Sequence, residues 1–221
     1  MHADWNWEEA KRELERSLQL NNNLSLAHEY YGWYLQAQGN LDGALAEEEL
    51  ALELDPVSGI INSNLAWTYF LRRDYGNAVK QFQKTLELDA KNPSTHGSLA
   101  RVYALQGRYQ DAVAELQEEF TLYGRLDVAS QFHKDLSVGG YHAVLRSEIA
   151  LLGKPSTQDY DPAVVAFDYA LLDESEKAFF WLERATERRS TINDLKVSPE
   201  LDNIRSDPRY ADLLRRMRLP Q

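Results

Sequence analysis

Small residues recur every 34 positions along the first half of this chain, and no other feature constrains the fold as strongly. One series is Ala10, Ala44, Ala78 and Ala112, and a second is Gly32, Ala66 and Ala100. Aligned columns at one fixed spacing are typical of proteins built from stacked copies of a single structural unit. The chain is therefore expected to be a repeat array.

Within each unit the apolar residues have the period of an α-helix. In the second copy, one stripe with spacing i, i+3, i+4, i+7 precedes a break at 73–74, and a second stripe follows it. The first stripe is Asn62, Leu65, Ala66 and Tyr69, and the second is Tyr75, Ala78, Val79, Phe82 and Leu86. Each unit is predicted to be two antiparallel helices, with Gly39 and Gly107 in the tight turns of the first and third copies. The fold class is thus all-α.

This pattern resembles the tetratricopeptide repeat (TPR), which has small residues at unit positions eight and twenty and a proline near the end of the unit. Its early tryptophan is replaced by His28, Asn62 and His96 in the three clearest copies. The resemblance implies a right-handed superhelical solenoid of antiparallel helix pairs. It places three repeats at 25–58, 59–92 and 93–126.

The flanking segments are less regular, and each has its own expectation. Residues 3–22 form a half repeat that carries only a second helix, which suggests that the chain starts inside a longer natural protein. Residues 127–158 are expected to be an irregular helix pair with an altered turn at 139–140 and a hinge at 153–157. The register returns in a TPR-like pair at 159–192, followed by a C-terminal cap at 193–221.

The C-terminal segment predicts a capping helix that starts near 206–208. Its apolar face consists of Tyr210, Leu213, Leu214 and Met217. A solenoid needs such a cap to cover the core of its last unit. The segment also resembles the end of TPR arrays in bacterial winged-helix regulators and serine/threonine protein kinases. This resemblance implies the sensory or scaffold part of a larger bacterial signalling protein.

Charge and cysteine content exclude several classes of function. Thirty-five acidic residues against 24 basic ones give a formal net charge of −11, which disfavours nucleic acid and anionic membranes as partners. The chain has no cysteine, so it has neither disulfides nor thiolate sites. No apolar run approaches the ~20 residues that span a bilayer, and the N-terminus lacks a signal-peptide pattern. A cytoplasmic location is expected.

Catalytic and metal sites find no support in the residue spacing. His28 and His96 lie two repeats apart, too far to share a metal ion, and are expected to be half-buried imidazoles. The carboxylate runs at 47–49 and 118–119 are expected on the solvated convex side. No phosphate loop, nucleophile elbow or HExxH pattern occurs. We therefore expect no enzyme activity, no cofactor and no metal.

The concave groove is the predicted site, because unit positions two, five, nine and twelve of each first helix should face it. Indole and guanidinium side chains dominate many binding hot spots, and this stripe contains both. Asn64 stands where the family often holds the backbone amide of a ligand. The candidate residues are Leu26, Glu29, Trp33, Gln36, Ile60, Ser63, Asn64, Trp67, Phe70 and Arg101.

A protein-interaction module that binds a partner segment, uncharged or mildly basic, is the function that this stripe favours. Large side chains in the stripe could instead fill gaps between neighbouring first helices. Two other functions stay open. One is a small-molecule sensor with an apolar pocket near the irregular fourth unit, lined by Phe132, Tyr141 and Tyr160. The other is a structural segment that forms a homodimer through its half repeat.

Overall fold

The computed structural model describes residues 6–152, 161–188 and 194–219, and the described residues form helices and no strand. The α-helices are α1 (Trp7–Leu20), α2 (Ser25–Gln38), α3 (Leu41–Leu54), α4 (Gly59–Leu71), α5 (Tyr75–Leu88), α6 (Pro93–Leu105), α7 (Tyr109–Leu122), α8 (Leu126–Leu152), α9 (Pro162–Leu171), α10 (Ser175–Arg188) and α11 (Pro208–Arg216). A 3-10 helix, η1 (Pro199–Ile204), precedes α11. The all-α, right-handed TPR solenoid predicted from the repeats is confirmed.

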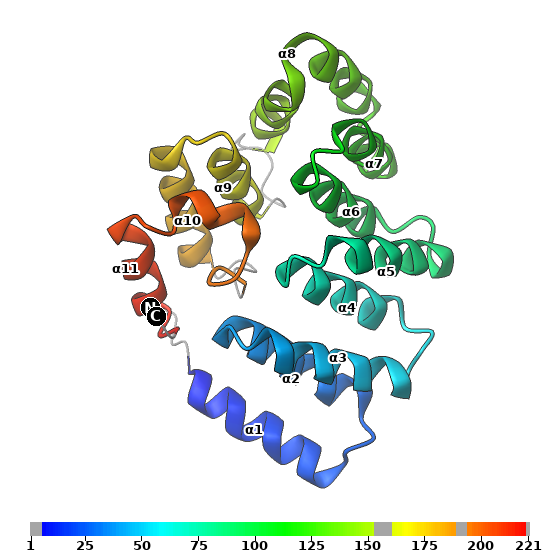
Figure 1. The fold of residues 1–221 in the computed structure, drawn as a ribbon, viewed down its shortest axis with the longest axis vertical. Helices are drawn as coiled ribbons and strands as arrows, with labels where there is room; N and C mark the ends of the chain where they lie inside the picture. Colours follow the sequence, from blue (N-terminus) through cyan, green and yellow to red (C-terminus); the bar gives the residue numbers. More distant parts are fainter. Residues whose placement is uncertain (1–5, 153–160, 189–193, 220–221) are drawn as a thin grey trace.

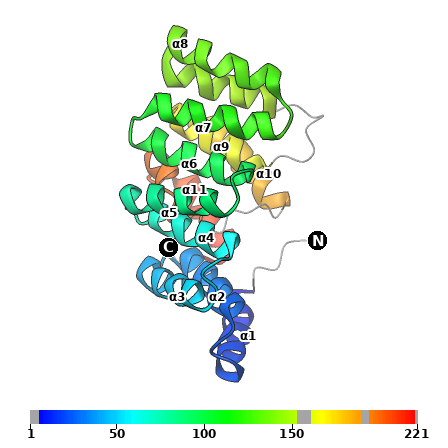
Figure 2. The same cartoon turned by 90° about the vertical axis from the view of Figure 1, so that its right-hand side faces the viewer.

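The helices pack as sequential pairs, α2 with α3, α4 with α5, α6 with α7, and α9 with α10. Seen from the side, they stack from α1 at one end to α8 at the other (Figure 2). Gly39 and Gly107 end the first helices of two pairs in the left-handed region, at φ 82 and 71. Arg73 takes the same place in the second pair at φ 63, where a side chain is less easily accommodated.

The irregular fourth unit, α8, consists of two helices that lie side by side and meet at a sharp turn at Gly140 (Figures 1 and 2). This glycine has φ 67 and ψ −168, a conformation available almost only to glycine, and it divides α8 into two helical halves. The turn predicted at 139–140 therefore lies at this glycine. The hinge predicted at 153–157 lies outside the described residues.

A recurring polar clasp ties the first helix of a repeat to its second helix. In the first repeat, Nδ1 of His28 lies 2.7 Å from Oε2 of Glu47, and Nε2 lies 2.9 Å from the carbonyl oxygen of Asn22. The same three positions are in contact in the next two repeats, among Asn62, Gln81 and Pro56, and among His96, Glu115 and Ala90. The residues that replace the family tryptophan thus exchange an apolar contact for hydrogen bonds.

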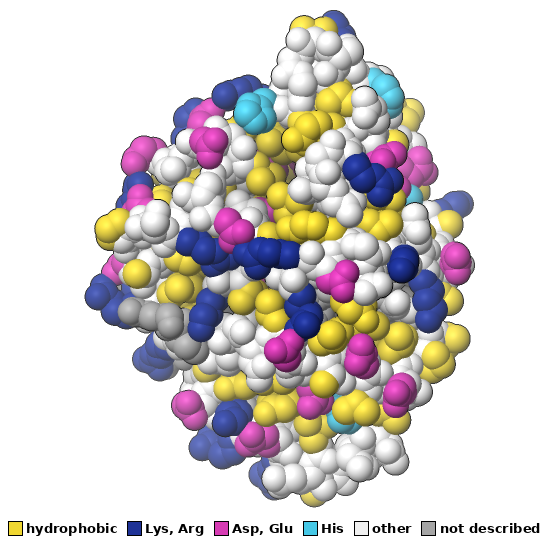
Figure 3. Space-filling model, viewed as in Figure 1, with side chains coloured by type: hydrophobic (Ala, Val, Ile, Leu, Met, Phe, Trp, Pro, Cys, Tyr) yellow, Lys and Arg dark blue, Asp and Glu magenta, His cyan; other side chains and the backbone are white. Residues whose placement is uncertain are grey.

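The C-terminal segment does more than cap the fifth pair. Residues 194–204 turn back into the concave side, and α11 packs against α9 and α10, so the described elements form a closed ring (Figure 1). The indole Nε1 of Trp7, in α1, donates a hydrogen bond of 2.6 Å to the carbonyl oxygen of Met217. Side chains fill the centre of the ring on the face drawn in Figure 3. None of the described helices is long and apolar enough to cross a membrane.

Glu48 corrects one expectation, because it lies in the core and not on the solvated side. Its side chain is fully buried beside Gly32, where an added Cβ would lie 2.8 Å from its Oε1. Neither of its carboxylate oxygens has a hydrogen-bond partner among the described residues. Burial raises the pKa of Glu48 to about 9. The helical period explains this burial, since the equivalent position of the other repeats is occupied by Leu14, Phe82 and Leu116.

Replacing Glu48 with leucine is expected to raise the free energy of unfolding by about 2–3 kcal/mol near pH 8. The folded state holds a proton that the unfolded carboxyl releases above its ordinary pKa of 4.5, so stability falls as pH rises from that value towards 9. Urea unfolding at about pH 5 and pH 8 should show a smaller decline in Glu48→Leu than in wild type. Glu53→Leu, at an exposed position of the same helix, is the control. An equal decline in wild type and Glu48→Leu would contradict the assignment.

Candidate functional site: the concave groove

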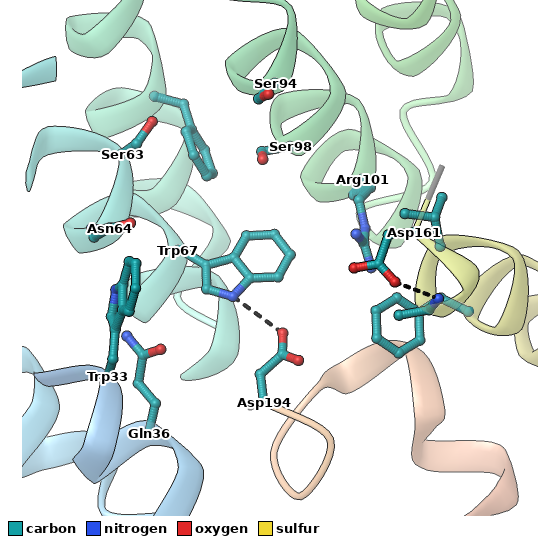
Figure 4. A pocket seen from close by; sticks show the side chains of 14 residues that line it. Trp33, Gln36, Ser63, Asn64, Trp67, Ser94, Ser98, Arg101, Asp161 and Asp194 are labelled. Carbon is teal, nitrogen blue, oxygen red and sulfur yellow. Dashed lines mark hydrogen bonds between the residues drawn. The ribbon is translucent and has the colours of Figure 1, made fainter. Parts of the chain in front are cut away.

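The concave wall is built by the first helices α2, α4 and α6, and a cavity of about 420 Å³ opens between this wall and α9. Ala163, Val164 and Phe167 of α9 line the opposite side, together with Asp194. Figure 4 shows the side chains that point into this space. Six predicted residues line it, namely Trp33, Gln36, Ser63, Asn64, Trp67 and Arg101.

Trp67 is held by the protein's own chain. Its Nε1 donates a hydrogen bond of 3.2 Å to Oδ2 of Asp194 (Figure 4), and its ring centroid lies 4.6 Å from that of Phe70. Burial raises the pKa of Asp194 to about 6, although this indole N–H favours the charged carboxylate. The contact fills space between α4 and the C-terminal segment, so Trp67 has a structural role.

Trp33 has a different environment in the same cavity. It is half-buried, and its described ring contact is an edge-on packing against Tyr30 of its own helix, with centroids 5.5 Å apart. No described hydrogen bond joins it to the C-terminal segment. Of the two indoles predicted to face the groove, Trp33 is therefore the one that the chain leaves more available.

Arg101 of α6 joins two distant parts of the sequence and lines the cavity. Its Nε donates a hydrogen bond of 2.8 Å to Oε1 of Glu200, and a second guanidinium nitrogen bonds to the other carboxylate oxygen. Its guanidinium carbon also lies 5.2 Å from the ring centroid of Trp67 and 4.7 Å from that of Phe167. Arg101 thus already has an internal anionic partner.

Three predicted groove residues are buried, and one of them corrects the prediction outright. Phe70 is fully buried in the core with Ala78 and Phe82, because position twelve of α4 turns towards α5 and not towards the groove. Glu29 and Gln36 are also buried, where they form bonds between neighbouring repeats. Nδ2 of Asn64 donates to Oε1 of Glu29 at 2.7 Å, and Nε2 of Gln36 donates to Oγ1 of Thr68 at 2.8 Å.

Leu26 and Ile60 lie on the first turns of α2 and α4, outside the cavity. Their side chains are 47% and 66% exposed. Each stands seven residues before a tryptophan of the same helix, and residues two turns apart share one helix face. The exposed stripe therefore leads from Leu26 and Ile60 towards Trp33 and Trp67.

The acidic residues of the C-terminal segment were missed by the sequence reasoning. Asp194 and Glu200 were assigned only to a cap, and nothing in their local pattern indicates contact with α4 and α6. One signal was available, because a carboxylate within an otherwise apolar, buried segment needs a partner. In the described parts of the chain, no three His, Cys, Asp or Glu side chains gather closely enough to hold a metal ion.

The apolar pocket suggested near the fourth unit is not as predicted. Phe132 is fully buried against Phe120, with ring centroids 5.3 Å apart, and belongs to the core. Tyr141 lines a second cavity whose walls combine apolar residues with several carboxylates, and Tyr160 lies outside the described residues. The space beside the fourth unit is therefore charged, since α7, α8 and α9 each contribute a carboxylate to it.

Comparison with known proteins supports the repeat assignment. Residues 69–118 match the family model described as tetratricopeptide repeat. The fold is similar to the crystal structure of MamA, with 14% identity and a TM-score of 0.50 over 83% of this chain and 89% of that one. It is also similar to YrrB, described as a TPR protein with an unusual peptide-binding site, with 20% identity and a TM-score of 0.50 over 83% and 96%. No curated protein matches the sequence. The family match thus covers part of the second and third repeats, and the described fold is that of a tetratricopeptide-repeat solenoid.

Proposed function

We propose that this chain is a non-catalytic interaction module that binds a partner protein segment along the wall formed by α2 and α4. The segment enters over Leu26 and Ile60 and reaches Trp33 in the cavity. The observation that carries this proposal is the half-buried indole of Trp33, which lines a cavity of about 420 Å³ without a bond to the C-terminal segment. YrrB, whose fold is similar, is described as having a peptide-binding site.

The contacts of the C-terminal segment restrict where a partner can bind. Asp194 holds Trp67 and Glu200 holds Arg101, so the middle of the groove is already engaged. A partner that uses the free part of the wall meets apolar side chains from Leu26 and Ile60, the indole of Trp33, and polar groups from Ser63 and Asn64. An apolar segment with neutral or mildly basic residues suits this surface and the net charge of −11.

The wider context of the module is part of the same proposal. The resemblance of residues 195–220 to the end of TPR arrays in bacterial regulators and kinases supports a sensory or scaffold role in a larger signalling protein. In such a protein the groove would receive the partner, and the attached effector would respond to it.

Replacing Trp33 with alanine is expected to weaken peptide binding about 30-fold, because a buried indole at an interface commonly contributes ~2 kcal/mol or more. Peptides are first selected from a random phage-displayed library on the immobilised wild-type chain. Their affinities for wild type, Trp33→Ala and Phe180→Ala are then measured by calorimetry. Phe180, 56% exposed on α10 and outside the cavity, is the matched control.

Thermal unfolding of the same variants separates binding from stability. We expect Trp33→Ala to keep a melting temperature close to that of wild type, since its described ring contact lies within its own helix. Selected peptides that bind Trp33→Ala as tightly as wild type, or that lose affinity only for Phe180→Ala, would refute the proposed site.

A further inference from the structure

A second cavity, of about 560 Å³, lies between α6, α7, α8 and α9, on the other side of Arg101 from the groove cavity. This volume is in the range of sites that enclose small organic molecules. Apolar walls come from residues such as Leu116, Tyr141 and Leu145. The charged groups in the lining are Arg101, Glu119, Arg125, Glu148, Asp161, Asp168 and Glu200.

Negative charge exceeds positive charge in this lining. The Arg101 guanidinium is paired with Glu200, and Arg125 bonds to Asp127 at 3.3 and 3.4 Å. No ion pair among the described residues includes Glu119, Glu148 or Asp168. Three carboxyl groups from three different helices therefore face one cavity without a bonded cation from the chain.

Two of these unpaired carboxyl groups are also buried. Glu148 and Asp168 are each only 7% exposed, and Oδ2 of Asp168 has no hydrogen-bond partner among the described residues. The Glu119 carboxylate lies against Gly97, where an added Cβ would be 2.6 Å from its Oε2. A residue larger than glycine at this position would displace the carboxylate from the cavity wall. A buried polar atom without a partner normally costs stability, so such an atom at a cavity indicates a ligand that completes it.

The pKa values agree with mutual repulsion among these groups. Burial and the charge of Glu148 raise the pKa of Glu119 to about 8. Burial likewise raises the pKa of Glu148 to about 7, against the opposing effect of Arg101, and holds that of Asp168 well above its ordinary value. The other charged groups that act on these carboxyls are Arg101 of α6 and Glu200 of η1.

We infer that this cavity binds a small organic cation, an aliphatic amine with one or more primary ammonium groups, between Glu119, Glu148 and Asp168. An ammonium group offers N–H donors to the carboxylate oxygens, and its alkyl chain suits Leu116 and Leu145. The Tyr141 ring adds a face for a cation–π contact. A single metal ion is a poor alternative, because no three acidic or imidazole side chains in the described regions are placed to coordinate one.

Calorimetry with putrescine and spermidine tests this assignment, at about 0.15 M salt to screen the surface charge. Both amines are expected to bind the wild-type chain near pH 8, and at least tenfold more weakly near pH 6, where Glu119 and Glu148 are largely protonated. The neutral analogue 1,4-butanediol and magnesium chloride are expected not to bind. Amine binding near pH 8 should also release protons, which is measured as a dependence of the heat on the buffer.

Two variants that preserve side-chain shape locate the site. Asp168→Asn and Glu148→Gln should each weaken amine binding at least tenfold, and the amines should no longer raise the melting temperature of either variant. Glu118→Gln is the matched control, because Glu118 is the exposed neighbour of Glu119 on α7. Amine affinities that are undetectable in wild type, or that are the same in all three variants, would overturn the inference.

Discussion

A chain shortened to end at Asp194 is expected to lose the folded structure of its fifth helix pair. Eight apolar side chains beyond that point are buried in one core cluster with α9 and α10, namely Leu195, Leu201, Ile204, Tyr210, Leu213, Leu214, Met217 and Leu219. Burying each such side chain contributes ~1.5–3 kcal/mol, so the apolar burial lost with the segment is at least comparable to the ~5–15 kcal/mol by which a whole domain is stable. Hydrogen exchange should show α9 and α10 unprotected.

The same experiment should leave the second and third repeats protected. Their core cluster, which includes Ala66, Phe70 and Phe82, contains no fully buried residue of the removed segment. Glu183→Gln is the control, because it removes only a surface ion pair with Arg216 and keeps the segment in place. Unchanged protection of α9 and α10 in the shortened chain would show that the segment is an appendage.

Replacing Arg101 with methionine is expected to destabilise the fold by about 3–5 kcal/mol, the usual effect of removing one partner of a buried ion pair. The guanidinium is largely buried, and its partner Glu200 almost completely. Without it, Glu119, Glu148 and Asp168 lose the positive charge that lowers their pKa values, so these pKa values rise further.

The sign of the pH dependence follows from those raised pKa values. Carboxyls that hold protons in the folded state but release them on unfolding make the fold less stable as pH increases. In urea unfolding, the free energy of unfolding of Arg101→Met should therefore fall further below that of wild type between about pH 6 and pH 8. Arg146→Met, which breaks an exposed pair with Glu174, should have little effect at either pH. A difference in the free energy of unfolding that becomes smaller as pH rises would contradict this account.

The sequence predicted the helix pairs because their causes are local. Alanines recur where the two helices of a pair approach closely, and Ala44, Ala78 and Ala112 are all fully buried. Helical period also decides which residues face inward. Applied strictly, it places Glu48 in the core, but its charge suggested a solvated position. The error came from weighting residue type above position.

The closure of the ring could not be predicted from any local pattern. The contacts of Trp67 with Asp194 and of Arg101 with Glu200 join residues 127 and 99 positions apart. Neither contact follows the spacing of the repeats. Two residues of the predicted groove stripe therefore bind the C-terminal segment of the same chain. The acidic cavity was missed for the same reason, since Glu119, Glu148 and Asp168 come from three separate units.

The bond between Trp7 and Met217 changes how this array should fold. In an open solenoid each unit touches only its neighbours, so the units can fold and unfold one after another. Here the first described helix and the last part of the chain hold each other, and a closing contact of long sequence separation forms late and slowly. During synthesis the wall of α2, α4 and α6 is completed well before residues 194–204 exist to cover it. The nascent chain therefore passes through a stage with an open groove, and only the finished ring can unfold as one cooperative body.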